Sequence, residues 1–308
     1  MSKARIEDCE KFTLDNPGKW TIQGFSKAGD RTGFMLYPLK ILLDAGLSTY
    51  LIPNAVLISH SHTDHSLALP NILTGRLKPV KGQEQLLGRP VYMPNDCVVP
   101  IQRLMEAAIM LSDNDKADVK SNYVNLLSQE YIYRRQGYQP QVVKKGDVFQ
   151  IPGVKNVEVE VLEAYHNTEC YGYGFISIKK KLKPTFQQAG KEAIIAAKKA
   201  GEEIYDTIKV PEFLYFVDST IQNFTQHTEW QKYPVITAEC TGFPGIHPVE
   251  VMTQRFHSHL SLIEPIMEQW PEKQWILIHT STTVKNDRLV EEEVRLREKG
   301  LNVTFVKQ

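Results

Sequence analysis

The sequence predicts an α/β fold in which many short strands combine with fewer helices. Three observations carry this prediction. Apolar, β-branched runs recur along the chain, a smaller number of stretches have helical periodicity, and several of the runs end in His, Asp or Glu. The 308 residues can bury a substantial core, and no repeat or Gly/Ser linker divides them. We therefore expect a single domain over residues 1–308.

Twelve runs have the β-branched or aromatic composition and the flanking turn residues that favour strands. They are Trp20–Phe25, Phe34–Leu36, Ile41–Asp44, Ala55–Ser59, Pro90–Met93, Asp147–Ile151, Val157–Ala164, Tyr171–Ile178, Phe213–Val217, Pro234–Ala238, Trp275–Ile278 and Val303–Val306. Strands dominate the first part of the chain, and strands and helices mix after it.

Five stretches are expected to be helical: Val98–Ser112, Ser121–Arg134, Lys191–Glu203, Gln254–Glu268 and Asp287–Lys299. The first has apolar residues three and four apart, as an amphipathic helix requires. For the last, Asn286-Asp287 is a suitable N-cap and Gly300 a suitable C-terminal stop.

Composition limits both the location and the partners of the chain. The four cysteines are far apart, which indicates reduced thiols in an intracellular, cytoplasmic or nuclear, protein. We see no signal peptide, and no window has the roughly 20 apolar residues of a membrane helix. The 36 basic and 36 acidic residues cancel, which argues against a polybasic nucleic-acid binder but leaves room for a local basic patch.

Such a patch lies at residues 179–209, where eight lysines face four acidic residues, a net charge of +4. The segment separates two predicted strands and is expected to be an insertion. It starts with a basic lead-in containing Lys179, Lys180, Lys181 and Lys183, and continues as a helix from about Gly190 to Glu203. Two interpretations stand: a solvated helix face, or an arm that grips phosphates.

The strongest chemical signal is the stretch Ser59–His65, which follows an apolar run. His60 and His62 are two apart in extended chain and project to the same side. Asp64 and His65 follow where the chain can turn into a helix. Imidazole and carboxylate ligands together suit Zn, Mn or Fe.

Four other apolar runs end at a ligand-type residue: His166, Asp218, Glu239 and His279. Each alone could be an ordinary turn residue. Strands that deliver polar side chains to one end of a sheet build a site there. With the histidine cluster, five His and two Asp would be enough for two metals that share a carboxylate.

The order His-x-His-x-Asp-His, then His166, Asp218 and His279, resembles the metallo-β-lactamase superfamily, and within it the RNase Z branch. Two motifs carry the narrower match. Ala238–Thr241 is similar to the HEAT segment of that branch, and His257–His259 to its following His-Ser segment. The +4 segment also lies where RNase Z enzymes carry a substrate-gripping arm. The resemblance implies an αββα four-layer sandwich of two mainly antiparallel sheets, with the metal site at one edge.

The resemblance also implies roles for individual residues. The first metal would be held by His60, His62 and His166. The second would be held by Asp64, His65 and His279, and Asp218 would bridge the two. Glu239 and His257 would protonate the leaving group, although His259 could take the place of His257. Lys179, Lys180, Lys181 and Lys183 would bind substrate, and the metals would be two divalent ions, Zn or alternatively Mn or Fe.

The implied activity is that of a dimetal phosphodiesterase, with precursor tRNA or less specific RNA as substrate, no membrane partner, and a homodimeric assembly. Loss of Asp64 is then expected to abolish cleavage. Departures from the RNase Z pattern include Val217 in place of Gly, Ala238 in place of His, and Asp44–Ser48 in place of Gly-Glu-Gly-Thr-Gln. Two alternatives are a thioesterase or lactonase of the glyoxalase-II type and a catalytically inactive scaffold that binds RNA or protein.

Overall fold

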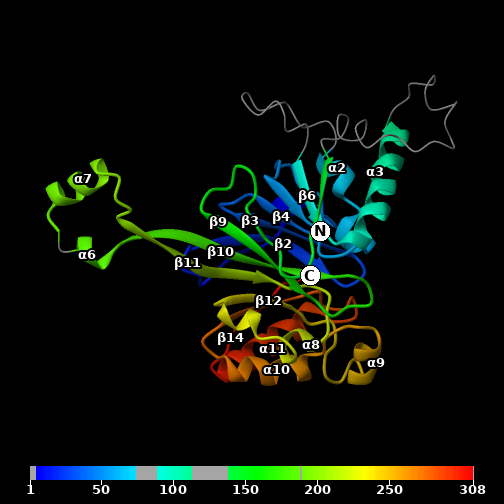
Figure 1. The fold of residues 1–308 in the computed structure, drawn as a ribbon. Helices are drawn as coiled ribbons and strands as arrows, with labels where there is room; N and C mark the ends of the chain where they lie inside the picture. The colour runs from blue at the N-terminus through cyan, green and yellow to red at the C-terminus, as the bar shows by residue number, and fades with distance from the viewer. Residues whose placement is uncertain (1–4, 74–88, 113–137, 188, 308) are drawn as a thin grey trace.

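The structure is a computed structural model that describes residues 5–73, 89–112, 138–187 and 189–307. Two seven-stranded sheets face each other, and helices cover their outer sides (Figure 1). The predicted α/β sandwich is therefore confirmed. Within the described part of the chain, no helix combines the length and apolar composition that a bilayer crossing needs.

The first sheet contains the N-terminal strands in chain order. They are β1 (Lys11–Thr13), β2 (Thr21–Lys27), β3 (Arg31–Tyr37), β4 (Ile41–Leu43), β5 (Ala55–Leu57), β6 (Arg89–Met93) and β7 (Tyr138–Val142). Its outer face is covered by α2 (Leu69–Leu73) and α3 (Val98–Ser112), whose apolar side chains share a buried cluster with those of β4 to β6.

The second sheet is also arranged in chain order, from β8 at one edge to β14 at the other. Its strands are β8 (Val148–Phe149), β9 (Val157–Glu163), β10 (Tyr171–Leu182), β11 (Tyr205–Tyr215), β12 (Val235–Glu239), β13 (Gln274–Ile278) and β14 (Asn302–Phe305). Its outer face packs against α10 (Leu260–Gln269) and α11 (Asn286–Glu298), with α8 (Gln222–Thr225) and α9 (Val249–Gln254) beside them (Figure 1).

The expectation of mainly antiparallel sheets is wrong, because each sheet is half antiparallel and half parallel. The pairs from β1 to β4 and from β8 to β11 are antiparallel. The pairs from β4 to β7 and from β11 to β14 are parallel. Parallel neighbours need crossover connections, and helical segments supply them between β11 and β14.

Burial on both faces explains the continuous apolar runs that mark the central strands. In β5, Ala55 and Leu57 face the core between the sheets, whereas Val56 faces the helices outside. In β13, Ile276 faces the inner core, whereas Trp275 packs outward. Alternate side chains point to opposite faces of a strand, so a strand covered on both sides is apolar throughout.

The predicted helix Gln254–Glu268 is wrong in its first turns. The structure has α9 ending at Gln254 and α10 beginning at Leu260, separated by an irregular stretch. Phe256 adopts a left-handed backbone with φ of 60°, which ends α9. His259 is the N-cap of α10, because its side chain accepts a hydrogen bond from the Ser261 amide.

The other helix predictions differ at their ends. The helix predicted at Lys191–Glu203 is α7 (Lys191–Lys199), and the left-handed Gly201 follows its end. The N-cap of α11 is Lys285, and the predicted cap residues Asn286 and Asp287 lie in its first turn. At the other end, Gly300 follows the helix with φ of 84°, as expected. The predicted helix Ser121–Arg134 lies outside the described residues.

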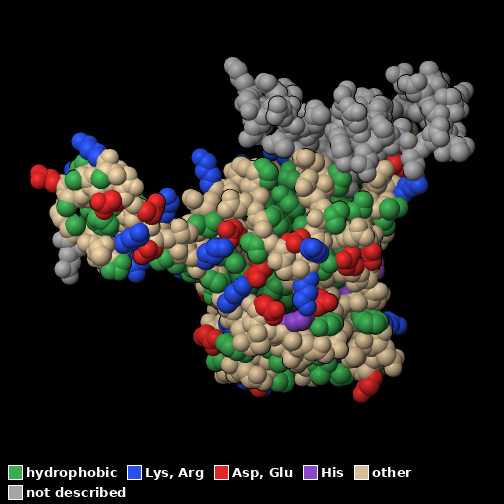
Figure 2. Space-filling view, in the orientation of Figure 1, with side chains coloured by type: hydrophobic (Ala, Val, Ile, Leu, Met, Phe, Trp, Pro, Cys, Tyr) green, Lys and Arg blue, Asp and Glu red, His purple; other side chains and the backbone are tan. Residues whose placement is uncertain are grey.

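The Lys-rich insertion is an arm that projects from the sandwich (Figure 1). The basic lead-in is not a separate element but the end of β10, which pairs with the start of β11 as a ribbon. The ribbon carries α6 (Pro184–Gln187) and α7. Figure 2 shows acidic as well as basic side chains on the arm.

Candidate metal centre

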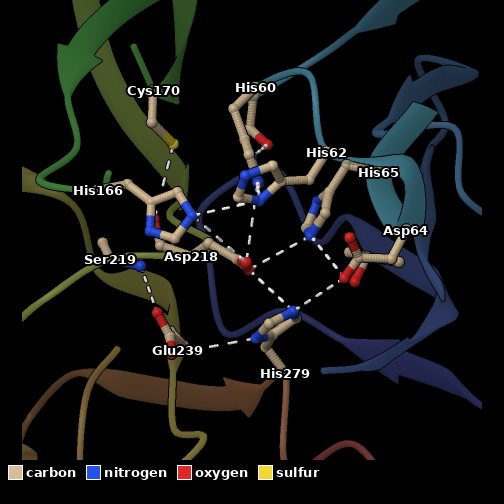
Figure 3. Close-up of polar contacts among 12 residues, drawn as sticks. His60, His62, Asp64, His65, His166, Cys170, Asp218, Ser219, Glu239 and His279 are labelled. Carbon is tan, nitrogen blue, oxygen red and sulfur yellow. Dashed lines mark hydrogen bonds and ion pairs between the residues drawn. The ribbon is translucent and has the colours of Figure 1, made fainter. Parts of the chain in front are cut away.

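Strands from both sheets end at one edge of the sandwich and deliver polar side chains to it. His60 follows β5, and the short helix α1 (Thr63–Ser66) carries Asp64 and His65. His166 follows β9 and Asp218 follows β11. Glu239 ends β12 and pairs in register with Ile278, so His279 emerges beside it. Figure 3 shows His60, His65, His166 and His279 arranged around Asp218, with Asp64 and Glu239 beside His279.

The first group contains His60, His62, His166 and Asp218, whose candidate ligand atoms all lie within 4.8 Å of one another. His62 Nδ1 is 2.9 Å from His60 Nε2 and 3.4 Å from His166 Nε2. Asp218 Oδ2 is 3.8 Å from His60 Nε2 and 3.9 Å from His166 Nε2. Three ring nitrogens and one carboxylate oxygen therefore surround a single point.

The second group contains Asp64, His65, Asp218 and His279. Asp218 Oδ1 is 3.3 Å from His65 Nε2 and 3.1 Å from His279 Nε2. Asp64 Oδ2 lies 3.4 Å and 3.3 Å from the same two nitrogens. The two oxygens of Asp218 thus face different groups, which is the geometry of a bridging carboxylate.

Hydrogen bonds on the far side of the rings fix which nitrogen faces each group. His65 Nδ1 lies 2.9 Å from an Asp44 carboxylate oxygen, which can only accept, so Nδ1 carries the proton. His166 Nδ1 likewise donates to the Phe256 carbonyl at 3.2 Å. Each ring then turns its Nε2 toward the centre, and this nitrogen would bind a metal ion in its unprotonated form.

Unpartnered buried atoms also fit divalent ions. Among the described residues, His65 Nε2 and Asp218 Oδ1 are buried, and although they lie 3.3 Å apart, neither has a hydrogen bond of acceptable geometry. Buried polar atoms are normally paired, and the exceptions need an explanation such as an ion. Nitrogen and carboxylate donors are the ligand set that Zn, Mn or Fe accept. The residues present therefore fit the pair of ions that the resemblance implies.

The two carboxylates of the centre are held in their ionised form. Burial opposes ionisation of Asp218, but His279 and His65 hold its pKa well below the usual range. Burial likewise opposes ionisation of Asp64, yet the adjacent His279 and His65 rings lower its pKa. Burial, with His65 nearby, lowers the pKa of His60 well below the usual value. The centre thus combines two carboxylates with a neutral His60 ring.

Asp44 is a candidate site residue to which the sequence interpretation assigned no role. It is fully buried, and its carboxylate accepts hydrogen bonds from the Ser59 amide at 2.7 Å, the Ser59 hydroxyl at 3.0 Å and the Tyr215 hydroxyl at 2.9 Å, besides that of His65. Leu43 pairs with Leu57, so Asp44 lies against the end of β5. A signal was present, because Asp44 ends an apolar run as the other site residues do.

Glu239 and His257 form a pair beside the second group. Buried Glu239 is 2.7 Å from His257 Nδ1 and also accepts from the Thr241 hydroxyl at 2.6 Å and the Ser258 amide at 3.2 Å. Burial lowers the pKa of His257, but the Glu239 carboxylate outweighs it and raises that pKa to about 9. With these protein groups alone, His257 is protonated at neutral pH.

The choice between His257 and His259 is clear in the geometry. His257 stacks beside His279 with ring centroids 5.6 Å apart. His259 instead caps α10, and its Nε2 lies 3.1 Å from the His247 carbonyl. His257 is therefore the ring that lies beside the candidate metal groups.

The arm lysines are not brought into this centre. They lie on or just beyond the β10–β11 ribbon. Lys179, Lys180 and Lys181 are all exposed there, but the Lys179 amine lies 3.5 Å from the fully buried carboxylate of Glu212. Lys179 is thus tied to the base of the arm and is a weaker candidate for substrate contact than its neighbours.

Gly46 sets how closely the second group can approach the first sheet. A Cβ added at Gly46 would lie 1.7 Å from the Asp64 carbonyl oxygen and 2.8 Å from the Thr32 amide nitrogen. We expect Gly46→Ala to lower the free energy of unfolding by about 1–3 kcal/mol and to displace Asp64. Thermal melts and metal content measure both effects. Gly190→Ala is the control, since its added Cβ meets nothing within 4 Å. Equal melting temperatures and equal metal contents in the two variants would show that Gly46 is not needed for the position of Asp64.

No protein-family model matches the chain. It is 27% identical over 273 residues to tRNase Z TRZ1 of Arabidopsis thaliana, which covers 86% of this chain and 88% of that protein. The metallo-β-lactamase fold protein YhfI from Bacillus subtilis is similar in structure, with a TM-score of 0.53 at 12% identity over 96% of each chain. The short form of human tRNase Z has a TM-score of 0.50 at 12% identity, over 93% of this chain and 96% of that one.

The fold and the His/Asp groups define a metal-dependent hydrolase with the metallo-β-lactamase fold. Within that class, the sequence similarity to tRNase Z confirms the resemblance to the RNase Z branch seen in the motifs.

Proposed function

We propose that the chain is a dimetal endoribonuclease that removes the 3′ trailer of precursor tRNA. The observation that carries the proposal is the combination of two ligand groups joined by Asp218 with a Glu239–His257 pair beside them. The named activity of the tRNase Z relative supports the RNA substrate.

The ligand groups would hold two divalent ions, for which we propose Zn. His60, His62 and His166 would hold one, Asp64, His65 and His279 the other, and Asp218 both. Such a pair supplies an activated water and offsets the charge that develops on a phosphodiester. Asp44 and the Phe256 carbonyl keep the rings of His65 and His166 in the binding orientation.

His257 supplies the proton that the departing 3′ oxygen needs. Its Nδ1 is held by Glu239, so Nε2 is the atom free to donate toward substrate. The carboxylate favours the imidazolium form, which is the form that acts as an acid. A hydrolysed thioester has no evident need for this pair, because a thiolate leaves without a proton.

We expect His257→Ala to lower kcat for RNA cleavage by about 10²–10⁴-fold while metal content stays unchanged. The reason is that His257 donates a proton and is not among the proposed ligands. Single-turnover cleavage and elemental analysis of the same sample measure the two quantities. Glu239→Gln should follow in the same direction. Loss of metal together with activity would instead make His257 a ligand.

The arm is proposed to hold the RNA backbone through Lys180, Lys181 and Lys183. Replacing these three by Ala should weaken RNA binding and reduce the slope of log K against log salt by up to about two to three units. Replacing Lys191, Lys198 and Lys199 on α7 provides a charge-matched control. An unchanged salt slope would remove the basic lead-in from substrate binding.

The substrate is tested by offering the metal-loaded protein three compounds in parallel: 3′-extended precursor tRNA, an unstructured RNA of equal length and a thioester. The proposal predicts cleavage of precursor tRNA at least tenfold faster than the unstructured RNA. Equal rates on both RNAs would indicate a less specific RNase. Hydrolysis of the thioester alone would contradict the proposal.

A further inference from the structure

Phe256 occupies the position after α9 where helices most often place glycine. The Phe256 amide donates to the Thr253 carbonyl at 3.0 Å and the His257 amide donates to the Met252 carbonyl at 2.9 Å. With φ of 60° at Phe256, these two bonds are those of a Schellman motif. A bulky side chain in the left-handed region is strained, and glycine would not be.

The backbone role of this residue does not explain the aromatic ring. The Phe256 carbonyl accepts from His166 Nδ1, but glycine would offer the same carbonyl. The side chain is 44% exposed, so burial in the core offers only partial compensation. Strained positions that the fold itself does not require are concentrated at functional sites.

The ring is attached at the rim of the candidate metal centre. The backbone carbonyl oxygen of Phe256 is 3.2 Å from Nδ1 of His166. The next residue along the chain is His257, the proposed proton donor. The ring centroid of His257 lies 5.6 Å from those of both His166 and His279. The backbone therefore attaches an exposed, uncharged aromatic side chain directly before His257, the residue proposed to protonate the leaving group.

We propose that Phe256 stacks on the nucleobase immediately 5′ to the scissile phosphate, whose 3′ oxygen receives the proton from His257. This inference rests on the proposed endoribonuclease function. A flat apolar ring recognises a ligand with a π-face, and single-stranded RNA presents its bases to aromatic side chains in this way. Phe256 then positions the leaving nucleotide beside its proton donor.

The size of the effect follows from measured base–aromatic contacts. Loss of one such stack should lower kcat/KM for RNA by about 5- to 150-fold. Phe256→Gly is the main variant, because glycine is preferred at this backbone position and the fold should persist. Its melting temperature is expected to be at or above that of the unchanged protein. Phe256→Leu keeps an apolar side chain of similar volume but has no π-face. Phe256→Tyr retains an aromatic ring.

The test is a double-mutant cycle between the ring and the base. Each protein cleaves 3′-extended RNA with an intact base, with an abasic ribose 5′ to the cleavage point, or with one 3′ to it. We expect the 5′ abasic site to slow the unchanged protein by the same factor as Phe256→Gly, with no further loss when the two are combined. Phe256→Tyr should recover most of kcat/KM, and Phe256→Leu should not.

Val294→Ala is the matched control, because it removes another half-exposed apolar side chain, on α11. It should change the cleavage rate of neither the intact RNA nor the abasic RNAs. The inference is overturned if the unchanged protein cleaves RNA but the losses from Phe256→Gly and the 5′ abasic site multiply independently. A loss of kcat/KM caused by the 3′ abasic site and not by the 5′ abasic site would also overturn the inference. Failure to cleave any RNA would overturn the proposed function together with the inference.

Discussion

Asp218→Ala is expected to remove both metals and to lower RNA cleavage by roughly a thousandfold or more. The reason is that Asp218 Oδ2 faces the first group and Oδ1 the second, so one carboxylate serves both. Its loss would also leave the five histidines of the two groups with Asp64 as the remaining carboxylate among the proposed ligands. Elemental analysis and single-turnover cleavage measure the two losses.

One further variant at Asp218 separates the effect of its charge from that of its shape, and a variant at Asp206 serves as a control. Asp218→Asn keeps the side-chain volume but cannot supply a bridging anion, so it should behave like Asp218→Ala. Asp206→Ala removes an exposed carboxylate from the arm ribbon and should leave the metal content unchanged. Two metals per chain and undiminished cleavage in Asp218→Asn would show that Asp218 is not the bridging ligand.

Asp44→Ala is expected to have the largest effect on stability, lowering the free energy of unfolding by about 3–5 kcal/mol. The change leaves the Ser59 amide and hydroxyl, His65 Nδ1 and the Tyr215 hydroxyl without their shared acceptor. Because His65 also loses its orientation, metal affinity should fall by about 10- to 100-fold. Denaturant unfolding and competition with a chelator measure these changes.

Asp44→Asn keeps this test interpretable if the alanine variant does not fold. Asp44 has a φ of 55°, a conformation that asparagine also tolerates. Tyr215→Phe is the matched control, since it removes a single hydrogen bond and should cost about 1 kcal/mol without a comparable loss of metal. Unchanged metal affinity in Asp44→Asn would mean that Asp44 does not position His65.

Much of the ligand cluster could be predicted because its members are local in sequence or end recognisable strands. The ligands from His60 to His65 lie within six consecutive residues, and His166 and His279 each follow an apolar run. Asp44 satisfies the same pattern and was predictable by it. The pairing of His257 with Glu239 was implied only by resemblance, because the break between α9 and α10 depends on a left-handed Phe256 that helical periodicity does not reveal.

The missed strands have identifiable causes. β1 has only three residues and a single buried side chain, Phe12, too short for a periodic signal. β7 contains Pro140, which lacks the amide hydrogen that a central strand would use, and it lies at the sheet edge. The half-parallel pairing of both sheets depends on helical crossovers, and strand composition alone does not determine it.

We propose that two metal ions, joined through Asp218, are needed for RNA cleavage. The most direct test removes metal from the protein and measures the cleavage rate of 3′-extended RNA while Zn is added back in known equivalents. We expect no cleavage without metal and a cleavage rate that reaches its plateau at two equivalents of Zn per chain. A plateau at one equivalent, or full cleavage by the metal-free protein, would contradict it.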